Sequence, residues 1–213
     1  MLTWILGVLF GVLAVPLALA VPHVWSAFLG GDHLRTFALG ALGGGLATVV
    51  VIRKAPFLAV LEHELTHMVV ALLHLRLPLS LNAGKEGGEV TYTGDSAFLI
   101  RLAPYVLPTF TIALLALSPA IASPHQTVLR AAIGVTWGYH VVTMLEETRP
   151  NQPDLKTGGR VPAFLGVAGL GLLFYVGSAL WAVDDFGLCR TWLERGVQTA
   201  RHLVSGAVSL AVG

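Results

Sequence analysis

Long apolar runs, separated by short polar or proline- and glycine-containing breaks, dominate the hydropathy pattern of this chain. Six such runs cover about residues 2–21, 37–52, 57–77, 98–117, 127–145 and 161–183. Runs of about 17 to 25 apolar residues are long enough to cross a bilayer as helices. The pattern therefore predicts an all-α integral membrane protein, a bundle of about six transmembrane helices that forms one membrane domain over residues 1–213.

Three local features refine this picture. Residues 87–93, Gly-Gly-Glu-Val-Thr-Tyr-Thr, have the alternation of a short β-type segment after a turn. Residues 189–213 have apolar positions at helical spacing with charges between them, which predicts an amphipathic C-terminal helix at the interface or on the bundle. The first run has no basic start, because the first Lys or Arg is Arg35, so we interpret it as a retained span rather than a signal peptide.

Composition supports the membrane interpretation and argues against a nucleic-acid partner and a cysteine-based site. Hydrophobic residues make up 55% of the 213 residues and charged residues 12%, and that charged share is roughly half that of a soluble domain. The 13 basic residues are scattered, with no cluster longer than Arg53-Lys54, so a nucleic-acid partner is not expected. Cys189 is the only cysteine, which excludes an internal disulfide and a cysteine-based zinc site.

The third run contains the motif His63-Glu64-Leu65-Thr66-His67. On a helix, residues four apart lie about 40° apart and one turn apart, so both imidazoles can reach one zinc ion. Glu64 is offset by about 100°, where it can serve as general base for a zinc-activated water. These polar groups are costly in hydrocarbon, so their presence in an apolar run indicates a functional site.

A catalytic zinc usually takes a third protein ligand, and the residues alone leave it open. His74 is excluded because it lies about 10 Å further along the helix than His67. Asp154 is the better candidate, in a segment where two prolines disfavour regular helix, although spacing alone favours a solvated loop carboxylate at this position. Glu146 and Glu147 are the other candidates.

Several short motifs occur in an order that resembles a known family. They are His63 to His67, the Gly-Gly-Glu-Val-Thr-Tyr segment, Leu102-Ala103-Pro104-Tyr105, Gly138-Tyr139-His140 and Asn151-Gln152-Pro153-Asp154-Leu155. Together they resemble the site-2 protease-like family of intramembrane zinc metallopeptidases, particularly its short bacterial members without a peptide-binding module. The resemblance covers residues 57–159, which we expect to form the metallopeptidase core.

This resemblance implies a ligand set, a reaction and a location. His63, His67 and Asp154 would hold Zn²⁺, and Glu64 would act as general base in hydrolysing a peptide bond of a membrane-spanning substrate protein. The family usually has Leu-Asp-Gly at the third ligand, whereas proline and leucine flank Asp154 here. The β-type segment would present an edge to an unwound substrate strand. The expected location is the bacterial plasma (inner) membrane, with the lipid bilayer and a transmembrane substrate as partners.

Two further residues and two other functions complete the interpretation. We assign His140 a catalytic role, either bonding the reacting carbonyl or holding a zinc ligand, with helix packing as the alternative. Tyr105 is interpreted as a packing or interfacial aromatic.

The alternative functions are a transporter or channel that uses the buried histidines for metal or proton passage, and a pseudoenzyme that binds membrane partners. Orientation and oligomeric state do not follow from the sequence.

The predicted spans also pose a geometric problem. If the third, fourth and fifth runs all cross the membrane, the start of the third run and Asp154 lie on opposite sides. Asp154 must then dip inward in a re-entrant segment, or the proline-interrupted fourth run does not cross.

Overall fold

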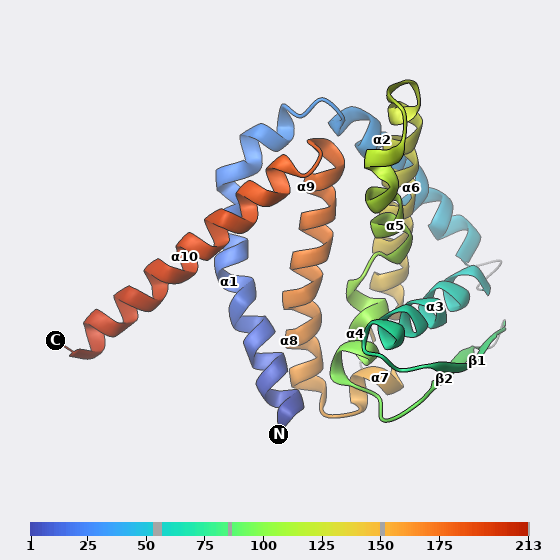
Figure 1. The fold of residues 1–213 in the computed structure, drawn as a ribbon, viewed down its shortest axis with the longest axis horizontal. Coiled ribbons are helices and arrows are strands. Elements are labelled where there is room, and N and C mark those ends of the chain that lie inside the picture. The colour runs from blue at the N-terminus through green and yellow to red at the C-terminus, as the bar shows by residue number, and fades with distance from the viewer. Residues whose placement is uncertain (53–56, 85–86, 150–151, 213) are drawn as a thin grey trace.

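The computed structural model describes residues 1–52, 57–84, 87–149 and 152–212, and helices make up most of them (Figure 1). The α-helices are α1 (Leu2–Leu29), α2 (Leu34–Ile52), α3 (Phe57–Leu73), α4 (Phe98–Val106), α5 (Thr109–Leu117), α6 (Gln126–Glu147), α7 (Pro153–Lys156), α8 (Arg160–Gly171), α9 (Gly177–Val183) and α10 (Gly187–Val212). A π-helical segment, η3 (Leu172–Val176), joins α8 to α9, and two 3₁₀ turns, η1 (Ser118–Ala120) and η2 (Ser123–His125), lie between α5 and α6. Strands β1 (Pro78–Ala83) and β2 (Gly88–Tyr92) pair as an antiparallel hairpin.

Membrane-length helices are confirmed, although fewer than the six predicted. Within the described ranges, α1, α6 and the continuous Arg160–Val183 helix are long and apolar enough to cross a bilayer. The fourth run is broken into α4 and α5, which meet at 79° and make a fourth span if counted together. The break follows from Pro108, which lacks an N–H and pushes Leu107 into extended backbone.

Close helix contacts hold the long helices together in two pairs. In Figure 1, α2 lies along α6, and α1 lies along the α8–α9 helix. A Cβ atom at Gly40 or Gly44 of α2 would overlap the backbone of α6, and one at Gly134 or Gly138 of α6 would overlap the backbone of α2. Glycines at four-residue spacing on both helices therefore let these two backbones approach each other directly.

Helix α3 lies across the bundle, near the end where α6 finishes and α7 and α8 begin (Figure 1). It packs on α4 and on the hairpin through a core cluster that includes Val70, Ala71, Ile100 and Ala103. α3 ends at Leu73, shorter than predicted, because Leu75 takes a left-handed conformation (φ 58°) and stops the helix. This crosswise course lets Asp154 approach α3 from the same end of the molecule, which answers the geometric problem that the sequence poses.

A second core cluster fixes α7 in its place beside α4. Leu155 is fully buried among residues of α4 and α8, including Leu102 and Tyr105. The buried leucine thus anchors the short helix that carries Asp154.

The predicted β-type segment and the predicted C-terminal helix both form regular secondary structure. The β-type segment forms β2, with Val90 opposite Leu81 of β1. A single helix, α10, covers the predicted C-terminal segment and is attached to α1 by Trp192, whose indole N–H donates to the Leu17 carbonyl at 2.9 Å. Its residues 201–210 are exposed and project from the bundle in Figure 1.

Candidate metal centre

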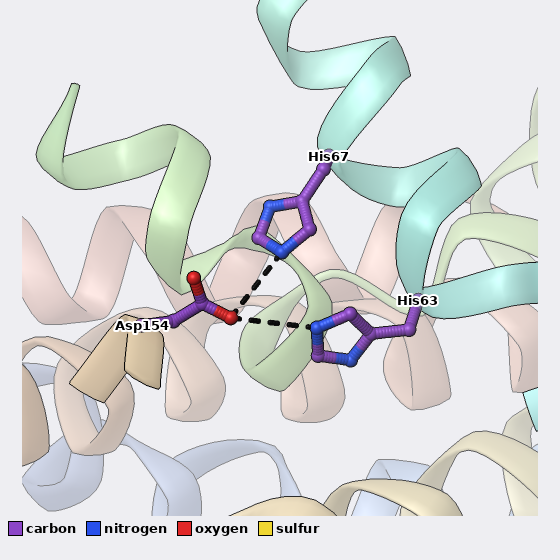
Figure 2. Close-up of side chains that lie close together, drawn as sticks. All are labelled: His63, His67 and Asp154. Atoms are coloured by element: carbon purple, nitrogen blue, oxygen red, sulfur yellow. Dashed lines mark ion pairs between the residues drawn. The ribbon is translucent and has the colours of Figure 1, made fainter. Parts of the chain in front are cut away.

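Two histidines from α3 and one aspartate from α7 converge on one point, as Figure 2 shows. The Nε2 atoms of His63 and His67 lie 3.5 and 3.4 Å from the same oxygen of Asp154, Oδ2. One ligand atom from each of the three residues lies within 4.8 Å of the other two. The helical spacing of the motif and the anchored α7 therefore bring together the three residues that the resemblance implies.

The separations of these atoms fit a tetrahedral metal ion. Zinc bonds of about 2.0–2.1 Å at tetrahedral angles place two ligand atoms about 3.4 Å apart. The two N–O distances, 3.5 and 3.4 Å, match this value. Two imidazole nitrogens and one carboxylate oxygen are also a donor set that zinc accepts. The residues present thus form a possible metal site, and its geometry does not identify the metal.

Each histidine ring uses its other nitrogen to contact a protein acceptor. His63 Nδ1 lies 2.8 Å from Glu147 Oε2, and His67 Nδ1 lies 2.7 Å from the carbonyl oxygen of Ile100. A ring N–H that donates to a carboxylate or carbonyl leaves the opposite nitrogen with a free lone pair, as is usual for metal-binding histidines. The two Nε2 atoms that face Asp154 are therefore the atoms available to bind a metal.

Asp154 stands at the start of α7, directly after Pro153 at the first helical position. Burial would raise the pKa of the Asp154 carboxyl, but the neighbouring imidazole groups of His63 and His67 outweigh this and hold the pKa well below its usual range. The Tyr105 hydroxyl donates a hydrogen bond to Asp154 Oδ2 over 3.3 Å. Both effects favour the charged form of the carboxylate. Asn151, which belongs to the same sequence motif, lies outside the described residues.

Glu64 is buried in the wall of the same pocket, a cavity of about 380 Å³ between α3, β2, the end of α6 and α7. A Cβ atom on Gly88 would lie 2.6 Å from Glu64 Cγ and 2.9 Å from Glu64 Oε1. Strand β2 therefore passes directly over this side chain, and the close approach requires glycine. The predicted general base lies in the metal pocket, and its role stays a prediction.

His140 lies in a different environment from the three ligand residues. Its Nδ1 atom is 3.0 Å from Glu62 Oε1 of α3, and its ring stacks on Tyr175 with centroids 5.6 Å apart. His140 and Glu62 are 2% and 3% exposed, and His140 does not belong to the described residues that line the metal pocket. The structure therefore pairs His140 with Glu62, and its predicted catalytic role remains a prediction.

Two residues of the site make contacts that sequence reasoning did not assign. Glu147, considered there as a third ligand, lies behind His63 instead. Tyr105, interpreted there as a packing aromatic, packs edge-on against His63 and also bonds Asp154. Glu146, the other ligand candidate, is not part of the metal-binding group found in the described part of the chain. Tyr105 differs from other buried tyrosines only in lying next to the His63–His67 motif in space. A sequence pattern does not reveal this proximity.

Comparison with known proteins gives no independent assignment. No family model, curated protein or solved structure matches this chain. What is established is a helical protein with three to four membrane-length helices and a possible metal site formed by His63, His67 and Asp154.

Proposed function

We propose that this chain is a zinc metalloprotease that hydrolyses peptide bonds of membrane-spanning proteins within or beside the bilayer. One observation carries the proposal. Two histidines with occupied Nδ1 atoms and one aspartate converge at tetrahedral separations, and a buried glutamate lies in the same pocket. This is the donor set and base of a zinc hydrolase, in a protein whose longest helices suit a membrane.

In the proposed mechanism, different residues of the chain bind the metal, transfer the proton and orient a ligand. A zinc ion held by His63, His67 and Asp154 would polarise a scissile carbonyl and acidify water. Glu64 would accept the proton of the attacking water and deliver it to the leaving amine, because its side chain lines the same pocket as His63, His67 and Asp154. Glu147 orients the His63 ring through the 2.8 Å hydrogen bond.

The resemblance to site-2 protease-like enzymes supports a peptide substrate. The order of the motifs along residues 57–159 and the β-strand over Glu64 both agree with it. On this proposal α2 joins the spans formed by α1, α4–α5, α6 and the α8–α9 helix in the bacterial inner membrane, and α3 lies across the end of this bundle. The hairpin edge would hold the substrate in an extended form, as peptide-bond hydrolysis requires an accessible main chain.

The direct test compares wild-type protein with Glu64→Gln in lipid vesicles. The probe is an apolar transmembrane peptide of about 20 residues with a fluorophore and a quencher at its ends. We expect wild type to cleave it and Glu64→Gln to bind zinc without cleaving, while Glu194→Gln, an exposed carboxylate on α10, behaves as wild type. Zinc flux into vesicles without cleavage would support the transporter alternative and contradict the proposal. Zinc binding without turnover or flux would support the pseudoenzyme.

A further inference from the structure

A second cavity lies between α6 and the α8–α9 helix, away from the metal pocket. It has a volume of about 420 Å³ and is lined by Trp137, Val141 and Met144 of α6 on one side. Leu172, Tyr175 and Val176 of η3 line the other side. A smaller apolar cavity of about 180 Å³ borders it and shares Trp137, Tyr175 and Val176 as lining residues. We call these two cavities the α6–α8 groove.

The groove is built around an irregular turn of the long helix. Residues Leu172–Val176 form a π-helix within the otherwise regular Arg160–Val183 segment. π-Helical turns are rare and often occur at functional sites. This turn presents the Tyr175 carbonyl to the indole N–H of Trp137 over 3.2 Å, which ties the two walls of the groove together. The widened turn therefore shapes the groove and also fixes its width.

The inner end of the groove touches the metal centre through one side chain. Tyr105 of α4 lines the groove and is fully buried, while its hydroxyl bonds Asp154 Oδ2 over 3.3 Å. Its ring also packs edge-on against His63 with centroids 5.4 Å apart. Tyr105 thus contacts both the apolar groove and two of the residues that would hold the metal.

We propose that the α6–α8 groove binds an apolar peptide segment, the membrane-spanning part of the substrate, and that Tyr105 is the partition the segment displaces to reach the metal centre. The identity of the occupant rests on the proposed function. The groove lies between two helices long and apolar enough to cross a membrane, so its ligand is drawn from the bilayer. Its apolar and aromatic walls fit apolar side chains.

The pocket beyond Tyr105 favours a peptide over a lipid chain. That pocket carries polar groups, including Glu89 of β2, Gln152 and Glu147. An acyl chain has no groups that would pair with this polar lining. A peptide segment offers apolar side chains to the groove and amide groups to the pocket, so one ligand satisfies both cavities.

Photo-cross-linking tests this proposal without needing catalysis. The full-length Glu64→Gln protein is reconstituted in phosphatidylcholine vesicles with a Leu/Ala peptide of about 20 residues that carries a central benzoylphenylalanine. Ala168→Trp fills the rim of the groove, and Ala200→Trp fills a similar apolar cavity between α1, α8 and α10 as the matched control. We expect cross-links on Trp137, Met144 or Tyr175 that Ala168→Trp reduces about tenfold and Ala200→Trp leaves unchanged.

Other outcomes overturn the proposal in distinguishable ways. Cross-links that map outside the groove in the Glu64→Gln protein, which keeps Ala168, would refute the groove proposal. This result does not depend on whether the Ala168→Trp variant folds. A phospholipid with a photoreactive acyl chain that labels the groove, and that the peptide does not displace, would make it a lipid site. Groove labelling by the peptide together with a wild type that never cleaves would support the groove and contradict the protease. Cleavage without groove labelling would support the protease and contradict the groove as the binding site of its substrate.

Discussion

Glu147 Oε2 lies 2.8 Å from Nδ1 of His63, on the side of the ring opposite Asp154. One imidazole therefore has a carboxylate on each nitrogen, one that orients it and one that shares its prospective metal. The sequence offers both this glutamate and Asp154 as the third ligand, and in the structure the two carboxylates approach different nitrogens of His63.

Removal of this orienting carboxylate should weaken metal binding without abolishing it. Replacing Glu147 by alanine leaves His63 free to rotate, and loss of such a partner typically costs about 10- to 100-fold in metal affinity. Glu147→Gln, whose amide oxygen can still accept the ring N–H, should cost less. Competition with a chelator measures both affinities. A Glu147→Ala protein as metal-free as His63→Ala would show that Glu147 is a ligand.

Loss of the Tyr105 hydroxyl should have a smaller effect on the same equilibrium. Tyr105→Phe keeps the ring against His63 and removes only the 3.3 Å hydrogen bond to Asp154. A hydrogen bond of this kind is worth about 0.5–1.5 kcal/mol, so metal affinity should fall by roughly two- to tenfold with little change in thermal stability. An unchanged affinity would mean that the hydroxyl does not support Asp154 once metal is bound.

A side chain at Gly88 should impair catalysis more than metal binding. The methyl group of Gly88→Ala would lie within 3 Å of the Glu64 side chain, which must move away or push β2 aside. Displacing a catalytic group by about 1 Å can cost about 10²-fold in rate. We expect peptide cleavage to fall strongly while zinc content stays the same. Gly84→Ala is the control, because its Cβ would make only an ordinary contact of 3.5 Å. Equal activities of the two variants would contradict the position assigned to Glu64.

The buried pair of Glu62 and His140 should contribute to stability. Both side chains are almost completely buried and lie 3.0 Å apart, so replacing either one leaves the other without its partner. Leaving a buried polar group without its partner typically costs about 1–3 kcal/mol. We expect Glu62→Gln and His140→Gln to lower the unfolding temperature alike, with the double variant less than additive. If His140→Gln instead lowers the turnover rate at unchanged stability, the catalytic prediction for His140 is correct.

The sequence predicts the parts of this site that local geometry determines. The four-residue spacing of His63 and His67 requires only that the segment be helical, and the alternation over residues 87–93 requires only an extended strand. Both predictions are therefore confirmed. The third ligand is of another kind, because Asp154 reaches the histidines only through the packing of Leu155 against α4 and α8. From the residues alone it could not be told from Glu147.

The orientation of α3 was also beyond the reach of the sequence. An apolar run of 17 residues fits a short membrane span as well as a helix that lies across the end of a bundle. Contacts with α4 and the hairpin decide between these, and both partners come later in the chain. The positions of Glu147 and Tyr105 depend on the same long-range packing, which explains why their contacts with His63 and Asp154 were not predicted.

The most direct test of the central claim is the metal content of the purified protein. Mass spectrometry should find about one zinc ion per wild-type chain, which His63→Ala, His67→Ala and Asp154→Ala each lose. Glu146→Ala, a neighbouring carboxylate outside the metal-binding group, should keep it. Zinc retained at the wild-type level by all three ligand variants would contradict the account.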